Sequence, residues 1–463
     1  MKNAIVRTLK DNTAFRWGIL LLVAFVQAAN YYFYDAISPL KRDLEEHFHF
    51  TNTDFGLFVS VYSISNIFLL MCIWGGIILD RIGIRRTGSL FIFLMTGGAF
   101  ITAYGASDYY VNGGFGYSFM NTFLTDYSPE LKMMLLGRFF FGLGAETSIV
   151  VVSKIIVKWF KGKELAMAFG FKIGIARAGS WAAFYFSPII AADAPTWNIA
   201  IWFAAILLGI ALLAFLIYII FDLKLDKQIE QTGLLGEDER FHPRDLVKLV
   251  TNKSFLFVTL LCMTFYSAVF PFQSFSPDFF LNKFGVSQEM SGKIASLLSL
   301  GTTFFTPLVG LFVDKKGRSA TLMIFGSLLI IFVHLSFALT MISPIFLMIV
   351  LGIAFSLVPA AMWPSVAKIV AEKRIGTAFG TMFAIQNLGL WAFPLLIGII
   401  LDKTNPGITP EDVAGGIATY NYTYAILMLA CLGVLGLFFA LLLKREDKNA
   451  GYGLELPSNE RQK

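Results

Sequence analysis

A charged loop pattern occurs twice in this chain, at matching places in its two halves. The first copy reads Gly76-Ile-Ile-Leu-Asp80-Arg81-Ile-Gly83-Ile-Arg85-Arg86, and a looser second copy reads Gly310-Leu-Phe-Val-Asp314-Lys315-Lys316-Gly317-Arg318. The two aspartates lie 314 − 80 = 234 positions apart, about half of the 463 residues. Each copy stands between two long apolar runs. This arrangement predicts a duplicated helical membrane protein with a cleft between its halves.

The composition agrees with a membrane protein, because 56% of the residues are hydrophobic and only 15% are charged, where soluble proteins carry about a quarter. Apolar runs of about 20 residues suffice to cross a bilayer as helices. We therefore expect an all-α membrane protein with twelve transmembrane helices in two pseudo-symmetric six-helix halves. The predicted spans are 16–39, 54–79, 87–107, 131–158, 164–191, 197–222, 254–281, 290–313, 319–341, 344–370, 375–401 and 420–443.

The positions of Lys and Arg predict the orientation. If both ends face the cytoplasm, 27 of the 37 basic residues lie in cytoplasmic segments, 6 lie in outer loops and 4 lie inside spans. The positive-inside rule favours this topology, in a cytoplasmic (inner) membrane. The predicted parts are the N-terminal half (1–222), a polar cytoplasmic connector (223–253), the C-terminal half (254–443) and a cytoplasmic tail (444–463). A short surface helix is expected from Phe241 to Val250, within the connector.

Several function classes lack support in the sequence. Cys72, Cys262 and Cys431 all lie inside apolar runs, which argues against a disulfide framework, a metal site or a redox cofactor. The basic residues occupy short loops, so the net charge of +6 does not indicate nucleic-acid binding. The chain has neither an ATPase-type glycine loop nor a catalytic triad pattern. We expect a transport protein and not an enzyme, with no cofactor.

Two opposite charges are predicted at the same depth of the membrane. Glu146 lies 158 − 146 = 12 residues from the inner end of its span, about 18 Å at ~1.5 Å per residue. Arg177 lies 177 − 164 = 13 residues from the inner end of the next span, about 20 Å by the same rise. A structural ion pair is one interpretation. The other is that Glu146 binds the ammonium and Arg177 the carboxylate of a zwitterion, and a dipeptide spans at most ~7 Å.

Further polar residues inside spans are candidates for the wall of the same cavity, although polar side chains also hold neighbouring helices together. Lys172 either adds positive potential to the cavity or points to lipid headgroups. Span seven is interrupted by Pro271 and Pro277, as is common beside a wet cavity. The candidate substrate-binding residues, beside Glu146 and Arg177, are Asn30, Tyr34, Lys172, Tyr266, Gln273, Trp363, Gln386 and Asn387.

Other charges near the spans have competing interpretations. Asp35 either couples protons, as Glu146 also could, or is a fixed partner of a cation. Arg138 is expected to pack in the outer half, and Lys154 to extend toward the inner surface. In the repeated loops, Asp80 and its counterpart can meet helix N-termini and basic residues, which would gate the inner side; alternatively the basic residues only set orientation. The candidate gating residues are Asp80, Arg81, Arg85, Asp314 and Arg318.

The repeated loops resemble the signature loop of the major facilitator superfamily, and Arg138-x-x-x-Gly142-x-Gly144 resembles its fourth-span motif. Further stretches are similar to the major facilitator superfamily domain-containing protein 1 family, the lysosomal dipeptide transporters of animals. These stretches are Gly137 to Glu146, Trp159 to Leu165, Ala176 to Ser180, Val269 to Phe272, Trp363-Pro364 and Ile385 to Gly389. The resemblance implies a dipeptide uniporter in which Glu146 contacts the ammonium and Arg177 the carboxylate.

The chain departs from that family in its outer segment 108–130, which is longer, and it shows no extended N-terminal sorting tail. Glu230-x-x-x-Leu234-Leu235 fits a dileucine sorting pattern that is common by chance. We therefore expect a prokaryotic-type plasma-membrane relative. A monomer is expected, and the sequence leaves an accessory subunit undetermined.

The resulting expectation is a facilitative or secondary-active transporter that moves dipeptides by alternating access. A proton-coupled transporter of organic anions or phosphate esters is the first alternative, because Lys172 and Arg177 together outnumber Glu146. A membrane sensor that binds a ligand without moving it is the alternative from another class.

Overall fold

The computed structural model describes residues 8–160, 163–230, 249, 251–371 and 374–457, and helices are the only regular elements within them. Two 3-10 turns, Leu9–Asp11 and Ser38–Leu40, flank the first long helix. The first half contains α1 (Thr13–Ala36), α2 (Lys41–Phe48), α3 (Asn52–Phe68), α4 (Met71–Gly105), α5 (Asp108–Val111), α6 (Tyr117–Met120), α7 (Pro129–Phe160), α8 (Leu165–Asp193) and α9 (Ile199–Glu230). The second half contains α11 (Lys253–Phe284), α12 (Gln288–Lys316), α13 (Ser319–Leu339), α14 (Pro344–Ile369), α15 (Ile375–Thr404), α16 (Pro410–Ala414) and α17 (Thr423–Ala450).

The twelve predicted spans are accounted for by these helices. In the described part of the chain, ten helices are long and apolar enough to cross a membrane. The 29-residue α8 corresponds to the predicted fifth span, and α3 with the first part of α4 corresponds to the second. The all-α, twelve-span fold class is therefore confirmed.

Two backbone features shape the first repeated loop. Leu70, between α3 and α4, has φ = 49°, so the second span is interrupted there. Gly83 has φ = 82° inside α4, and this kink separates the second span from the third. Positive φ is unstrained in glycine, which has no Cβ, so Gly83 allows the chain to turn within the first repeated loop.

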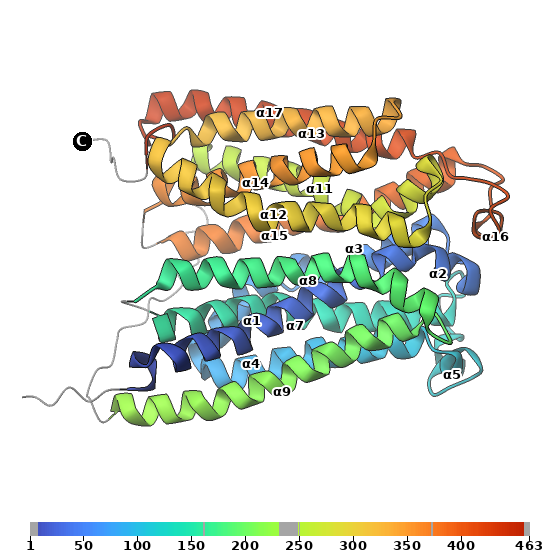
Figure 1. Cartoon of the computed structure of the whole chain (residues 1–463), viewed down its shortest axis with the longest axis horizontal. Helices are drawn as coiled ribbons and strands as arrows, with labels where there is room; N and C mark the ends of the chain where they lie inside the picture. The colour runs from blue at the N-terminus through green and yellow to red at the C-terminus, as the bar shows by residue number, and fades with distance from the viewer. Residues whose placement is uncertain (1–7, 161–162, 231–248, 250, 372–373, 458–463) are drawn as a thin grey trace, which may run out of the picture.

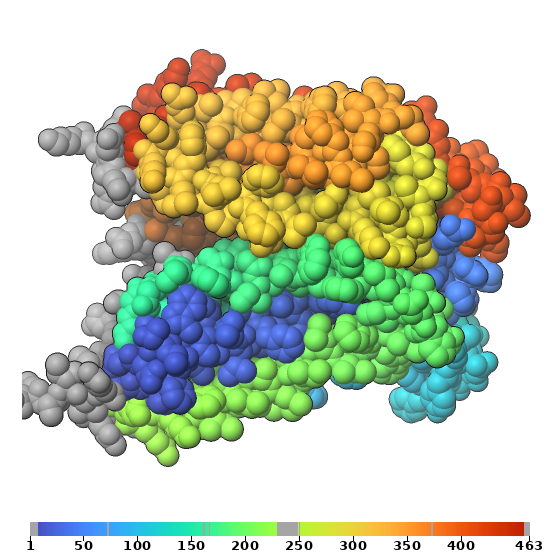
Figure 2. All heavy atoms as spheres, in the orientation of Figure 1, coloured from blue at the N-terminus to red at the C-terminus, as the bar shows by residue number. Residues whose placement is uncertain are grey.

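The two halves lie side by side as layers of roughly parallel helices (Figure 1). α1 begins and α17 ends at the same end of the bundle, here called the terminal end; the other is the opposite end. Between the halves, α3 packs against α15 and α8 packs against α12. Figure 2 shows the halves in direct contact toward the opposite end.

The connector and the outer segment differ in how much of them is described. α9 continues to Glu230, beyond the end of the predicted span at 222. The predicted surface helix, Phe241 to Val250, and the dileucine pattern fall largely outside the described residues. The outer segment 108–130 forms α5 and α6 and is anchored by the buried Tyr110, whose hydroxyl donates to the Pro129 carbonyl at 3.2 Å.

Candidate functional site

A cavity of about 820 Å³ lies between the two halves. Its wall includes residues of α1, α3, α4, α7 and α8 from the first half and of α11, α12, α14 and α15 from the second. It extends to Asp80, Gly310 and Gly376, which lie near the terminal end of their helices. The side chain of Asp80 is 45% exposed, so the cavity is open at the terminal end.

Glu146 of α7 and Arg177 of α8 both face this cavity. The Tyr62 hydroxyl donates a hydrogen bond of 2.7 Å to Glu146 Oε1. The Arg177 guanidinium lies 5.2–5.4 Å from three ring centroids, those of Tyr31, Phe270 and Phe355. Within the described residues, Glu146 and Arg177 are not ion-paired with each other, so the structural ion-pair interpretation does not hold in this conformation.

Nine of the ten candidate substrate-binding residues line the cavity, namely Asn30, Tyr34, Glu146, Lys172, Arg177, Tyr266, Trp363, Gln386 and Asn387. The tenth candidate, Gln273, is not among the described residues that line the cavity. Its side chain is buried inside the second half, where Nε2 donates to Ser299 Oγ at 3.1 Å. Pro271 and Pro277 lie within a continuous α11, so the expected break beside the cavity is absent from this helix.

Several lining contacts join elements that are distant in sequence. Trp363 Nε1 donates to the Tyr266 hydroxyl at 3.2 Å, which links α14 to α11. Asn66 Nδ2 donates to Asn387 Oδ1 at 3.4 Å, which links α3 of the first half to α15 of the second. Asn387 therefore contributes to the contact between the halves as well as to the cavity wall.

The other charges inside the spans are placed as follows. Lys172 lines the cavity, and its Nζ donates to Ser153 Oγ at 2.8 Å. In this conformation its side chain therefore faces the cavity and not the lipid headgroups. Arg138 is buried: Nη2 donates to the Tyr34 carbonyl at 3.1 Å, and four aromatic rings surround the guanidinium. Asp35 is buried outside the described cavity lining.

Aromatic residues form a part of the site that the sequence analysis missed. Tyr31, Tyr62, Phe270 and Phe355 all line the cavity, and each contacts Glu146 or Arg177 as described above. Tyr31 lies one position after Asn30 and three before Tyr34, so helical spacing could have identified it. Phe270 lies four residues after Tyr266, on the same face of α11. No comparable signal marks Tyr62 or Phe355.

The first repeated loop is held within its own half in this conformation. Lys154 Nζ lies 2.6 Å from Asp80 Oδ1, so Lys154 pairs with this loop. Arg85 pairs with Asp226 at 2.6 Å and with Asp222 at 3.4 Å, both on α9. Arg81 is exposed. A gating role for this loop remains a prediction, because the cavity is open on its side.

The second repeated loop contacts the end of the described chain. The backbone amides of Arg318 and Ser319 donate to the carbonyls of Glu455 and Leu454, each at 3.0 Å. Lys368, at the end of α14, donates to the carbonyls of Gly453 and Leu456 at 3.0 and 2.8 Å. Asp314 is exposed at the end of α12, and its gating role also remains a prediction.

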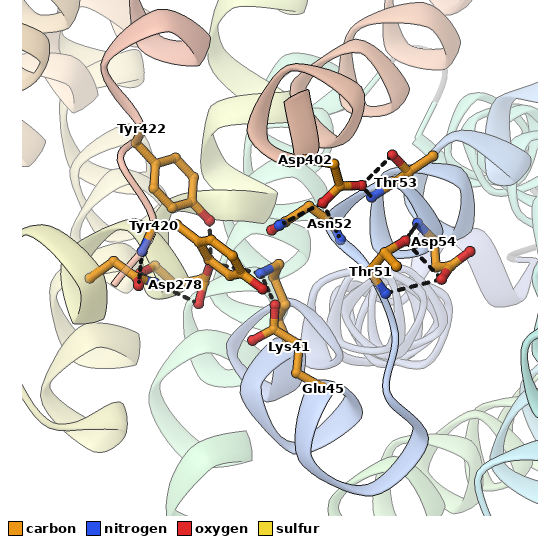
Figure 3. A network of polar contacts seen from close by, with 11 residues as sticks. Lys41, Glu45, Thr51, Asn52, Thr53, Asp54, Asp278, Asp402, Tyr420 and Tyr422 are labelled. Carbon is orange, nitrogen blue, oxygen red and sulfur yellow. Dashed lines mark hydrogen bonds and ion pairs between the residues drawn. The ribbon is translucent and has the colours of Figure 1, made fainter. Parts of the chain in front are cut away.

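The opposite end of the cavity is closed by polar contacts between the halves (Figure 3). The Asp402 carboxylate of α15 accepts hydrogen bonds from the backbone amides of Asn52 and Thr53, at 3.2 and 2.9 Å, and from both side chains. Because these amides lie at the N-terminus of α3, the negative charge of Asp402 also lies at the positive end of that helix dipole. Nearby, Gln288 donates to Asp43 Oδ2 at 2.6 Å, again across the halves.

The comparisons with known proteins agree with this architecture. The model of the Major Facilitator Superfamily matches residues 20–394 and 272–460. The chain is 31% identical over 400 residues to the lysosomal dipeptide transporter MFSD1 of Homo sapiens, covering 84% of this chain and 81% of that protein. It is 29% identical over 435 residues to the MFSD1 of Danio rerio, covering 91% and 86%.

Solved structures of low sequence identity share the fold. A bacterial homologue of the human lysosomal transporter Spinster, in an inward-facing and occupied conformation, superposes with a TM-score of 0.67 at 16% identity, covering 94% of this chain and 98% of that one. The D-xylose-proton symporter gives 0.69 at 15% identity, covering 92% and 97%. On the family match, the MFSD1 relationship and the two-half helical architecture, this chain belongs to the major facilitator superfamily of membrane transporters.

Proposed function

We propose that this transporter carries dipeptides by alternating access, with Glu146 binding the peptide ammonium and Arg177 the peptide carboxylate. One observation carries the proposal: two opposite charges face a single cavity from neighbouring helices and are not paired with each other. An isolated charge in the membrane costs roughly 3 kcal/mol on insertion scales. A bound zwitterion would neutralise both charges at once.

The surroundings of the two charges suit the two ends of a peptide. Tyr62 donates to one oxygen of Glu146, which leaves the other oxygen for an ammonium group. The rings around Arg177 fix the plane of its guanidinium without using its N–H donors. Those donors can form a two-pronged contact with a carboxylate.

The size of the cavity supports the same class of substrate. Pockets of roughly 300–1,000 Å³ enclose small organic ligands, and this cavity measures about 820 Å³. A dipeptide backbone spans at most ~7 Å, so side chains of varied size fit around it. The name that the MFSD1 relatives carry, lysosomal dipeptide transporter, adds independent support.

The test is thermal stabilisation of the purified protein by a dipeptide in detergent. We expect Arg177→Ala to abolish the stabilisation, and Glu146→Gln to weaken it most for peptides with a free amino end. The exposed carboxylate of Glu289, outside the cavity, provides a matched control in Glu289→Gln. Unchanged stabilisation of the Arg177 and Glu146 variants would refute the assigned site.

A second candidate is favoured by the presence of Lys172 in the same wall. With Arg177 it makes the inner part of the cavity positive, which suits a proton-coupled carrier of organic anions or phosphate esters. N-terminal acetylation of a dipeptide separates the two candidates. A site for a zwitterion loses affinity on acetylation, whereas a site for an anion keeps it.

Transport itself, its energy source and its location are part of the proposal. Accumulation of a labelled dipeptide in proteoliposomes separates a carrier from a membrane sensor that only binds. Passive uniport predicts uptake that is unaffected by an imposed pH gradient, and proton symport predicts acceleration. We expect a monomer in a cytoplasmic membrane with both termini on the cytoplasmic side.

A further inference from the structure

A cluster of three charged side chains is buried between the halves at the opposite end (Figure 3). Lys41 and Glu45 belong to α2 of the first half, and Asp278 belongs to α11 of the second. Their side chains are only 1%, 1% and 2% exposed. Lys41 Nζ lies 2.5 Å from Glu45 Oε1 and 2.7 Å from Asp278 Oδ2, so one ammonium group bridges two carboxyl groups.

The charges in this cluster do not balance if both carboxyl groups are ionised. Two carboxylates against one ammonium leave one uncompensated negative charge, buried away from solvent. Burial of such a charge is strongly unfavourable, and a buried carboxyl group avoids it by keeping its proton. The cluster is neutral only when it holds one additional proton.

The hydrogen bonds indicate which carboxyl group carries that proton. Asp278 accepts three hydrogen bonds: Lys41 and the Tyr422 hydroxyl donate to Oδ2, and Asn282 Nδ2 donates to Oδ1 at 3.0 Å. Glu45 receives only the Lys41 bond, and its Oε2 is buried without a hydrogen-bond partner. Glu45 has fewer donors to stabilise a negative charge, so Glu45 is the protonated member.

The other groups around the cluster leave this assignment unchanged. The Tyr420 ring lies 5.0 Å from Lys41 Nζ. Arg42, the next residue on α2, donates to the Ala414 carbonyl at 2.5 Å. Asp402 is occupied by Asn52 and Thr53. The cluster's members and charged or titratable neighbours are thus Lys41, Arg42, Glu45, Asp278, Asp402, Tyr420 and Tyr422.

We propose that Glu45, with Lys41 and Asp278, forms a proton-binding site that exists only while the opposite end is closed. When the halves separate there, Asp278 and Tyr422 move away with the second half, and Glu45 meets water beside Lys41. Glu45 then releases its proton. Closure takes that proton up again, so low pH favours the closed opposite end and high pH favours its opening.

This site regulates the cycle without driving it. None of Lys41, Glu45 and Asp278 belongs to the described cavity lining, so the proton enters and leaves on the same side of the membrane. The cluster therefore makes opening of the opposite end depend on the pH of the solution at that end. It moves no net proton across the bilayer. This inference holds whichever substrate the cavity carries.

The test is a distance measurement between the halves at the opposite end as a function of pH. Spin labels at Asn112 and at Ile417, both exposed and on different halves, report opening in a background with Cys72, Cys262 and Cys431 replaced. Between pH values of about 5 and 9, where a buried carboxyl group titrates, the open fraction of the parent protein should rise. Glu45→Gln, a neutral isostere of the protonated acid, should remain closed and lose that dependence.

The exposed pair His49–Glu411 supplies a matched control, because it also joins the halves but lies at the surface. Glu411→Gln should keep the pH response of the parent. An infrared band of a protonated carboxyl group, present in the parent and missing in Glu45→Gln, gives a second measurement that needs no opening. A pH-independent parent, a Glu45→Gln profile equal to the parent's, or a missing band would each overturn the proposal.

Discussion

The two ends of the contact between the halves use the same residue type in opposite surroundings. At the opposite end, a Cβ on Gly56 would lie 2.5 Å from the Pro394 carbonyl oxygen, one on Gly292 2.4 Å from that of Phe184, and one on Gly398 2.2 Å from that of Asn52. Toward the terminal end, a Cβ on Gly76, Gly310 or Gly376 would have no neighbour within 4 Å.

The difference suits a fold whose glycines allow close helix contact at one end and leave open space at the other. Small residues let helices approach closely inside membranes. At the opposite end they already do so, between α3 and α15 and between α8 and α12. Gly76 and Gly310 are the first residues of the two copies of the repeated loop, and both line the cavity. In alternating access they are expected to become contact points when the terminal end closes.

The largest expected effect comes from Gly398→Leu. Its side chain would collide with backbone of α3, and overpacking of this kind costs about 1–3 kcal/mol. We expect the opposite end to remain open, with a fall in dipeptide uptake of about tenfold or more, since 1.4 kcal/mol corresponds to one factor of ten. The spin-label distance between Asn112 and Ile417 checks it, and an unchanged closed fraction would contradict it.

Gly376→Leu, on the same helix, should act in the reverse sense. The described conformation has room for the side chain, so folding and dipeptide binding from the terminal side should be preserved. Closure of the terminal end should be hindered, with a loss of uptake close to that of Gly398→Leu. Thermal stabilisation by dipeptide together with proteoliposome uptake separates binding from transport. If uptake is normal, the terminal end does not close at this glycine.

Asp402→Asn is expected to have an intermediate effect. The asparagine amide keeps the shape of the carboxylate but removes its negative charge at the start of α3. Its NH2 group replaces one acceptor oxygen and now faces a hydrogen-bond donor. Hydrogen bonds to charged groups contribute about 1.5–3 kcal/mol and those between neutral groups about 0.5–1.5 kcal/mol, so the substitution weakens this contact without abolishing it. The closed fraction at the opposite end should fall several-fold, as measured by the same spin-label pair. Asp412→Asn is the matched control, because Asp412 caps α16 within its own half.

The smallest effect is expected from Lys293→Gln. Lys293 pairs with Glu289 on the exposed face of α12, and its Nζ lies 5.4 Å from the ring centroid of Tyr185 on α8. Such exposed contacts contribute about 0.2–1 kcal/mol. The closed fraction at the opposite end should change by less than about threefold. A larger change would mean that exposed contacts, and not the buried ones, determine the closed state.

The fold and part of the site could be predicted from the sequence because they depend on local patterns. Apolar runs and the repeated loop give the spans and the two halves, and helical rise alone brings Glu146 and Arg177 to one depth. Gln273 lies outside the described cavity lining, because a polar residue inside a span can also serve helix contacts, as its bond to Ser299 shows.

The closed end could not be predicted in this way. Lys41 was counted only as a basic residue of an outer loop, and its partner Asp278 is 237 positions distant. The bond from Thr53 to Asp402 joins residues 349 positions apart. Such pairs arise from the docking of one half on the other, which no local spacing encodes.

The bonds that residues 318 and 319, at the second repeated loop, make with residues 454 and 455 have a consequence for biosynthesis. The amides of Arg318 and Ser319 acquire their partners only after Leu454 and Glu455 have left the ribosome. The second half therefore forms these hydrogen bonds only after its last helix, α17, has been inserted. Translation intermediates halted before that point should expose the loop to proteases, and the finished chain should protect it.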